Sequence, residues 1–329
     1  MVYSKINSGS LLTLKKRKSF FASRPTIYIC VILGAILVAC AYKVRTDTIF
    51  ACQADGYTAD RYIAYCNGRG YADYEHGAFW FDLEPVARNF ARNADVLFLG
   101  NSRLQIALST VTTTNWFSAA SARYYLLGFG FSENVIFAEQ LLLKIRPKAR
   151  VYVINVDDFF DRWETPPVKT VFHDPDARNR YEGKRIWQHV HESICKRFPR
   201  LCGTDYAIFR SRATGAYERR MPKQMIVPVS YDWSISESVV NNNTATATKF
   251  LSDLTINREC VILTMVPTVD TRIGDVNAIA KAVGLDLMIP EIRAELRTND
   301  GSHLDQPSAE QWSQAFFQLA SSRIRSCLE

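Results

Sequence analysis

The first 25 residues contain no acidic side chain, although they hold six lysines and arginines. Of the 40 basic residues in the chain, 34 therefore lie after this tail, where they meet all 33 aspartates and glutamates. The positive excess belongs to the tail alone. The rest of the chain lacks the charge bias that nucleic-acid binding requires.

The sequence also has no CxxC pair, no internal repeat and no low-complexity tract. The missing CxxC argues against structural zinc and against thioredoxin-like redox chemistry. What remains is an ordinary globular composition, with 47% hydrophobic and 22% charged residues. A chain of 329 residues can bury a core in one large domain or two smaller ones.

One apolar, charge-free run stands out, from Ile27 to Tyr42. It is slightly shorter than the about 20 residues of a typical membrane span. The basic cluster at 15–18 precedes it, so the positive-inside rule keeps the N-terminus in the cytoplasm. We predict a basic cytoplasmic tail over 1–25 and a transmembrane signal anchor over 26–42. The remainder is then extracytoplasmic, and periplasmic in a Gram-negative cell.

Two other interpretations of this segment stay open. Leu37-Val-Ala-Cys40 is similar to the lipobox of a lipoprotein signal, in which Cys40 carries the lipid. A fully cleaved signal peptide is the third alternative. All three place the large remainder outside the cytoplasm.

The cysteines agree with an exported domain. Six follow the apolar run, and an even number in an oxidising compartment permits disulfides. Proximity in the sequence favours Cys52–Cys66 and Cys195–Cys202, which leaves Cys260–Cys327. Six cysteines can pair in many ways, so other pairings stay open.

Further along the chain, residues 43–90 form a polar, aromatic-rich lead-in with little regular pattern. From about residue 91, strand-like apolar runs alternate with helical patterns, which indicates a parallel α/β sheet. Residues 161–255 interrupt the rhythm and are interpreted as an insertion or subdomain. The expected strands are 95–99, 124–129, 151–154, 260–266 and a short one at 285–289. The expected helices begin at 103, at 132 with Ser132 as cap, at 272, and at 308 with a capping box Ser308-Ala-Glu-Gln311.

Ser102 is the first candidate for chemistry. Gly100-Asn101-Ser102 forms the expected turn between a hydrophobic strand and a helix. The serine hydroxyl then lies at the C-terminal edge of a parallel sheet, where open α/β folds bind ligands. Backbone N–H groups at the helix start point to the same place and are suited to stabilise an oxyanion. By itself, however, a serine at a helix start is usually only an N-cap.

The second candidate is Asp300-Gly-Ser-His303, which precedes the last helix. A nucleophilic serine needs a base, and the base needs an acid that orients its imidazole. His303 and Asp300 are the right residue types at a spacing that a loop can bring into contact. Alone, this pattern also fits a turn with an incidental histidine.

Together the two blocks resemble the SGNH (GDSL-like) hydrolase superfamily. The matching pieces are 96–102 and 300–304, and the resemblance covers about 91–160 and 256–327. It fits best the membrane-anchored extracytoplasmic branch that resembles the partner proteins of teichoic-acid D-alanylation and alginate O-acetylation. The resemblance implies a three-layer α/β/α flavodoxin-like domain over 91–329 that carries the insertion.

The resemblance also implies roles for individual residues. Ser102 would be the nucleophile, His303 the base and Asp300 its orienting acid. An oxyanion-hole glycine would be Gly128 or Gly130, and the oxyanion-hole asparagine would be Asn155.

The chain departs from the family pattern in two blocks. Asn101 replaces the usual aspartate of the first block. The third block reads Ile154-Asn-Val-Asp157, where the family has Gly-x-Asn-Asp. These departures put the orientation of Asn155 in question.

The function expected from this resemblance is an extracytoplasmic serine esterase or O-acyltransferase. Its partner would be an acylated carbohydrate or lipid-linked glycan, and a membrane-bound O-acyltransferase could work beside it. Neither a cofactor nor a metal is expected. Two alternatives stay open: an inactive SGNH-like glycan-binding or scaffolding module, and a tethered structural protein in which both blocks are only caps and turns.

Other polar groups carry weaker signals. An acidic cluster after the third strand favours a solvated loop over a metal site, and His189-Val-His191 has the spacing of two ligands on a strand but lacks a third. A basic run within the insertion favours a solvated face over a site for an anionic glycan. The acidic cluster is Asp157, Asp158, Asp161 and Glu164, and the basic run is Arg210, Arg212, Arg219, Arg220 and Lys223.

Overall fold

The computed structural model describes residues 24–68, 71–219, 226–292 and 295–329, in two units that meet between Val44 and Arg45. Helix α1 (Arg24–Asp47) contains the expected anchor, and Pro25–Asp47 is long and apolar enough to cross a membrane. A signal sequence has the same properties, so α1 fits either a membrane anchor or a signal peptide. Most of the expected tail, residues 1–23, lies outside the described residues.

The second unit is built on a parallel sheet, as the alternating pattern predicts. Its strand order is β4-β3-β5-β9, and every neighbouring pair is parallel. All residues of these strands are buried, which explains why they appear as continuous apolar runs. The strands are β3 (Val96–Asn101), β4 (Tyr124–Phe129), β5 (Val151–Asn155) and β9 (Val261–Thr264).

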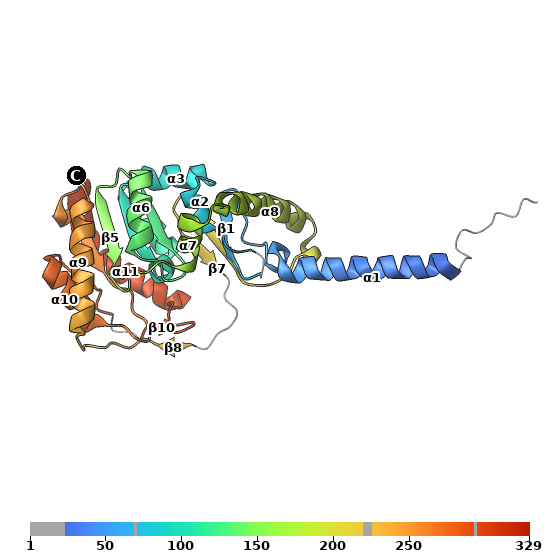
Figure 1. Cartoon of the computed structure of the whole chain (residues 1–329). Helices are drawn as coiled ribbons and strands as arrows, with labels where there is room; N and C mark the ends of the chain where they lie inside the picture. Colours follow the sequence, from blue (N-terminus) through green and yellow to red (C-terminus); the bar gives the residue numbers. More distant parts are fainter. Residues whose placement is uncertain (1–23, 69–70, 220–225, 293–294) are drawn as a thin grey trace, which may run out of the picture. The chain divides into compact units, whose positions relative to one another are not determined.

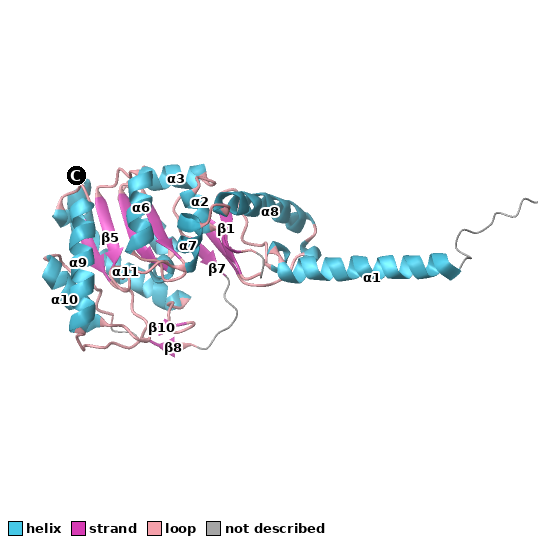
Figure 2. Cartoon of the chain, in the orientation of Figure 1, coloured by secondary structure: helices cyan, strands magenta, loops and turns pink. Residues whose placement is uncertain are grey.

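Helices cover both faces of this sheet (Figures 1 and 2). Successive strand residues alternate between two hydrophobic clusters: Phe98 belongs to one, and Leu97 and Leu99 to the other. The Phe98 face packs against α4 (Ser102–Ala107), α5 (Thr110–Ala119) and α11 (Gln306–Leu328). The opposite face packs against α3 (Pro85–Arg92), α6 (Val135–Ile145), α9 (Glu237–Asp253) and α10 (Ile273–Val283).

The lead-in 43–90 has more regular structure than its sequence predicts. It contains η1 (Ile49–Ala51), β1 (Arg61–Cys66), β2 (Ala72–Asp73), α2 (Glu75–Trp80) and α3. Strand β1 is buried at most positions, so it lacks the polar–apolar alternation that marks a strand in a sequence. It pairs with β6 (Ala207–Ser211), which lies in the expected insertion. The result is a second, antiparallel sheet in the order β2-β1-β6-β7, where β7 is Tyr217–Arg219.

The insertion also differs from the expected range 161–255. Helices α7 (Pro166–His173) and α8 (Ala177–Arg197), the short η2 (Pro199–Leu201) and β8 (Val227–Pro228) form its first part. Helix α9 instead packs against the parallel sheet beside α10, and Ala247 and Phe250 are buried in its core (Figure 1). The α/β rhythm therefore resumes with α9, before residue 255.

The structure joins the cysteines as proximity suggests: Cys52–Cys66, Cys195–Cys202 and Cys260–Cys327. Cys30 and Cys40 are free thiols on α1.

Two predicted helix caps and one strand are wrong. Asn134 caps α6 in place of Ser132, and Asp305 caps α11 in place of Ser308, whose backbone N–H donates to the Asp305 carboxylate at 2.9 Å. Aspartate and asparagine cap as well as serine does, so sequence type alone could not choose among these neighbours. The expected strand at 285–289 is reduced to one parallel bridge between Leu263 and Leu287.

Candidate functional site

Ser102 begins helix α4, directly after strand β3. Asn101 caps this helix, because its Oδ1 accepts a 2.9 Å hydrogen bond from the Arg103 backbone N–H. The cap therefore comes from Asn101, which leaves the Ser102 hydroxyl free for another partner. Ser102 is half-buried at the C-terminal edge of the parallel sheet.

That partner is His303, which is 201 positions further along the chain. The Ser102 Oγ lies 2.9 Å from His303 Nε2. On the other side of the ring, His303 Nδ1 lies 2.7 Å from Asp300 Oδ2. The structure thus brings the three predicted triad side chains into one hydrogen-bonded chain, in the order that nucleophilic catalysis requires.

The loop 299–303 is shaped to hold this histidine. Gly301 has a φ of +81°, which is in the left-handed region that glycine adopts without strain. The Asn299 N–H donates to the His303 carbonyl at 2.9 Å, and the Val269 N–H donates to the Gly301 carbonyl at 3.1 Å. Strand β10 (Arg297–Thr298), paired with β8, leads into the loop, and the Thr298 hydroxyl accepts from the Gly301 N–H at 3.1 Å.

Asp300 is held as a carboxylate. Partial burial alone would raise its pKa, but the hydrogen bond and electrostatic attraction of His303 and the backbone N–H groups of Ser302 and His303 outweigh burial. The pKa of Asp300 is therefore well below its usual range. A permanent negative charge at this position fixes the ring orientation and stabilises an imidazolium once His303 takes a proton.

Arg103 connects the two halves of the triad, and sequence reasoning missed it. Its Nε donates to the Ser302 hydroxyl at 3.0 Å, so the residue after the serine contacts the residue before the histidine. Its Nη1 is paired with Asp157 and, at 3.1 Å, with Asp158. An arginine after the serine carries no recognisable signal by itself, because its partners are distant in the sequence.

The two glycines expected for an oxyanion hole, Gly128 and Gly130, differ in their surroundings. The Gly130 N–H donates to Glu75 Oε1 at 2.9 Å and is therefore occupied. Gly128 lies in β4, where a Cβ would come within 3.0 Å of the Gly100 carbonyl and of Gln105. Gly128 thus lets α4 approach the sheet, and Gln105 fastens α4 there with a 2.6 Å hydrogen bond to the Gly128 carbonyl.

Asn155 ends strand β5, beside the end of β3. A Cβ on Gly100 would lie 3.1 Å from the Asn155 Cβ, so this glycine makes room for the asparagine side chain. The Asn155 Oδ1 accepts from the Val266 N–H at 2.9 Å. Its buried Nδ2 has no hydrogen-bond partner within the described part of the chain. This amide is a buried donor without a partner on the strand that neighbours β3.

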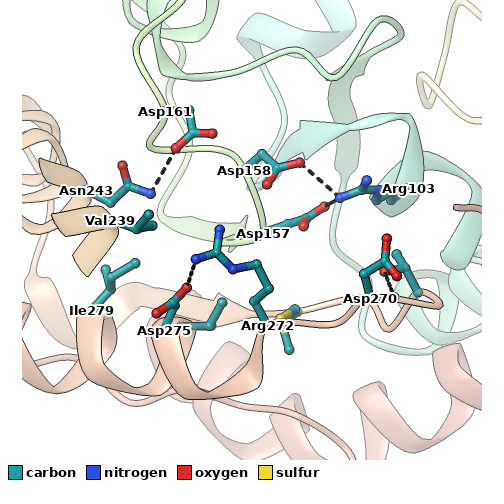
Figure 3. Close-up of a pocket in the computed structure, with 13 residues that line it drawn as sticks. Arg103, Asp157, Asp158, Asp161, Val239, Asn243, Asp270, Arg272, Asp275 and Ile279 are labelled. Carbon is teal, nitrogen blue, oxygen red and sulfur yellow. Dashed lines mark hydrogen bonds and ion pairs between the residues drawn. The ribbon is translucent and has the colours of Figure 1, made fainter. Parts of the chain in front are cut away.

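A polar pocket of about 200 Å³ adjoins Arg103 (Figure 3). Figure 3 shows Arg103 paired with Asp157 and Asp158 at one side, and Arg272 paired with Asp275 at another. Burial and the nearby Asp158 raise the pKa of Asp157, against the lowering effect of Arg103. Three members of the cluster after β5, Asp157, Asp158 and Asp161, therefore line a pocket and do not form only the solvated loop that the sequence favours.

The basic run of the insertion is also different from a solvated face. Arg210 is fully buried and pairs with Glu75 at 2.7 Å. Arg212 is half-buried and pairs with Glu84 at 2.7 Å. Arg220, Lys223 and the side chain of Arg219 lie outside the described residues.

The two histidines at 189 and 191 do not share a face, because they lie on helix α8 and not on a strand. His191 is buried and lies 3.0 Å from the Tyr57 hydroxyl. Burial lowers its pKa to about 4, so the ring is neutral. Its nearby cysteines, Cys195 and Cys202, are joined in a disulfide and are not available as metal ligands.

Comparisons with protein-family models, with curated proteins and with solved structures found no match to this chain.

Proposed function

We propose that the chain is an extracytoplasmic serine esterase or O-acyltransferase of the SGNH type, acting on an acylated carbohydrate. The observation that carries the proposal is the hydrogen-bonded chain from Ser102 through His303 to Asp300 at the edge of a parallel sheet. A serine, a histidine and an aspartate in this order are the parts of a nucleophilic triad.

The sheet supports the same family. Counted in chain order within the parallel sheet, the strands lie as 2-1-3-4, which is the flavodoxin-like order without its last strand. The bridge at Leu263 and Leu287 lies where that fifth strand would begin. The reversal of strand order occurs between β3 and β5, and in such sheets this is where ligands bind. Ser102 directly follows β3, and Asn155 is the last residue of β5.

In the proposed mechanism, Ser102 Oγ attacks the carbonyl carbon of an acyl ester while His303 Nε2 takes the hydroxyl proton. The ester C–O bond then breaks, and His303 returns the proton to the leaving alcohol. This leaves an acyl group on Ser102. Water or a sugar hydroxyl attacks that acyl-enzyme, with His303 again acting first as base and then as acid.

The developing oxyanion needs N–H donors. The Asn155 Nδ2 is a buried amide without a partner among the described residues, which makes it the best-supported donor. The Gly130 N–H is less suitable because Glu75 already binds it. We therefore propose Asn155, and not Gly130, for this role.

The proposed setting is the outer side of a cytoplasmic membrane, with α1 as an uncleaved anchor. A single apolar helix and three disulfides support it. A tethered enzyme meets polymeric or lipid-linked glycans more readily than free metabolites. A membrane-bound O-acyltransferase is the proposed source of the acyl group if the reaction is transfer.

The test uses the full chain in detergent and a fluorophosphonate that reacts with activated serines. Peptide mass spectrometry should locate the adduct on Ser102, and the adduct should disappear in His303→Ala. Ser118→Ala, at an exposed helix position, is the matched control and should label as the wild type does. A folded protein that forms no adduct would sink the mechanism.

The inactive scaffolding function is the second candidate, and one observation favours it. Of the two glycines proposed for the oxyanion hole, Gly130 has its N–H engaged by Glu75. Absence of labelling together with retention of glycan on the immobilised full chain would support this candidate.

A further inference from the structure

Helix α8 exposes large apolar side chains that no described element covers. Ile186 is 63% and Trp187 56% exposed, and just beyond the helix Phe198 and Leu201 are 53% and 57% exposed. The half-buried Val190 and Ile194 recur at helical spacing between them. We call Ile186, Trp187, Phe198 and Leu201, with the neighbouring Arg197 and Arg200, the α8–η2 face.

This segment also carries an excess of positive charge. Residues 177–201 contain seven lysines and arginines and only two glutamates. Part of this charge is paired: Glu182 binds Arg178, Glu192 binds Lys196, and Asp174, which lies just before the segment, binds Arg180. The remainder of the chain after residue 45 has 25 basic and 31 acidic residues, so the positive charge is concentrated here.

The chain that follows α1 is fastened to this segment. The Phe50 ring lies 6.5 Å from the Trp187 ring and 5.3 Å from the His191 ring. The Gly203 N–H donates to the Phe50 carbonyl at 2.7 Å. The disulfide Cys52–Cys66 joins the residue after η1 to the end of β1, and Cys195–Cys202 joins α8 to the residue after η2. The start of the second unit and α8 therefore move as one body.

Chain length then limits how far this face can be from a bilayer. The apolar run of α1 ends at Tyr42, and Ile49 already belongs to the clamped segment. The connection spans about 10 Å as helix and at most about 25 Å fully extended. An anchored α1 therefore holds the start of the second unit, which is fastened to α8, within about 25 Å of the end of the apolar run.

We propose that the α8–η2 face binds the anionic lipid surface of the membrane that holds α1. Tryptophan and arginine beside aliphatic side chains are suited to the headgroup boundary, and each cation near an anionic leaflet adds to the attraction. A second copy is a poor occupant, because two such basic faces would repel one another. The proposal rests on membrane anchoring by α1 and is independent of the triad chemistry.

The test reconstitutes the full chain in two kinds of vesicle, one rich in anionic phosphatidylglycerol and one of phosphatidylcholine alone. Each kind is prepared with and without lipids brominated near the headgroup. Tryptophan fluorescence is measured with and without the brominated lipid. Bromolipid should quench the wild type, and Trp187→Phe should remove that quenching. Trp233→Phe, which removes another exposed tryptophan at 70% exposure, is the matched control and should leave the quenching unchanged.

Charge reversal tests the lipid specificity. Arg197→Glu with Arg200→Glu should abolish the Trp187-dependent quenching in anionic vesicles, whereas Lys148→Glu with Lys169→Glu, at exposed positions elsewhere, should not. Equal quenching in Trp187→Phe and wild type would overturn the proposal. So would a Trp187 that is shielded from aqueous acrylamide but not quenched by bromolipid, which would indicate a protein partner. Release of the full chain from vesicles by alkaline carbonate would instead refute the anchoring itself.

Discussion

Asp73 and His76 are three residues apart, as are Asp300 and His303, and each aspartate contacts the Nδ1 of its histidine, at 2.8 Å and 2.7 Å. The two pairs differ in what lies beyond the ring. His303 Nε2 faces the neutral Ser102 hydroxyl, whereas His76 Nε2 lies 2.8 Å from the Glu133 carboxylate. They differ also in exposure, because the His76 side chain is fully buried and that of His303 is 19% exposed.

The second carboxylate changes the chemistry of His76. Burial alone would lower its pKa, but Asp73 and Glu133 outweigh burial and raise the pKa to about 10. His76 is therefore a cation at neutral pH and has no free lone pair with which to accept a proton. A buried imidazolium between two carboxylates holds β2, α2 and the loop before α6 together, which is a structural function.

Mutation of the Asp300–His303 pair should give the largest effect, a loss of Ser102 labelling. His303→Gln removes the base of the proposed triad, and loss of a triad base typically costs a factor of about 10³ or more. The rate of fluorophosphonate labelling should fall by at least that factor, while the melting temperature changes little. Labelling at the wild-type rate would show that the two pairs do not differ in the proposed way.

Mutation of the buried Asp73–His76 pair should lower stability and leave the labelling of Ser102 intact. His76→Gln leaves two buried carboxylates without their cation, and breaking a buried ion pair typically costs about 3–5 kcal/mol. Denaturant unfolding at pH 6 should show this loss, and Ser102 labelling should persist under conditions where the variant stays folded. A stability equal to that of the wild type would mean that the Asp73–His76–Glu133 cluster contributes little.

The pH dependence sharpens the comparison further. Because the pKa of His76 is raised from 6.5 to about 10, its contribution to stability is complete below pH 6.5 and is lost as the pH rises towards 10. The difference in unfolding free energy between wild type and His76→Gln should therefore shrink between these pH values. Melting curves of both proteins across this range measure it, and a constant difference would contradict the assignment.

A smaller effect on the labelling rate is expected at Arg103, which contacts Ser302 beside His303. Arg103→Ala removes the contacts to Ser302, Asp157 and Asp158, and a small displacement of a catalytic group can cost about 10- to 100-fold in rate. Labelling of Ser102 should slow accordingly, with partial rescue by Arg103→Lys. A purely structural role would lower the melting temperature of both variants and leave the labelling rate of the folded protein unchanged.

Sequence patterns predicted the parallel sheet because its strands are buried on both faces and appear as apolar runs of strand length. The expected range of β4 and the expected start of α10 agree closely with the structure. The second sheet was missed because β1 and β6 are far apart in the chain, with 141 positions between even their nearest partners, Cys66 and Ala207, and because neither strand shows a two-residue alternation. Pairing between distant strands leaves no local signal.

In the candidate site, too, local patterns were recognisable in the sequence and long-range contacts were not. Ser102, Asp300 and His303 were recognisable because each lies in a short block with a characteristic order. The sequence did not reveal the role of Arg103, the occupied Gly130 N–H or the pairing of Arg210 with Glu75. Each of these depends on a contact between segments far apart in the chain.

The sequence by itself determined the apolar segment, the α/β class and the residue types available for a triad, since these follow from local composition and period. Only the tertiary structure decided which Asp-x-x-His faces a hydroxyl and which faces a second carboxylate. The reason is physical: the pKa and the reactivity of a histidine depend on burial and on the atom opposite Nε2. In both pairs a distant segment supplies that atom, Ser102 in one and Glu133 in the other.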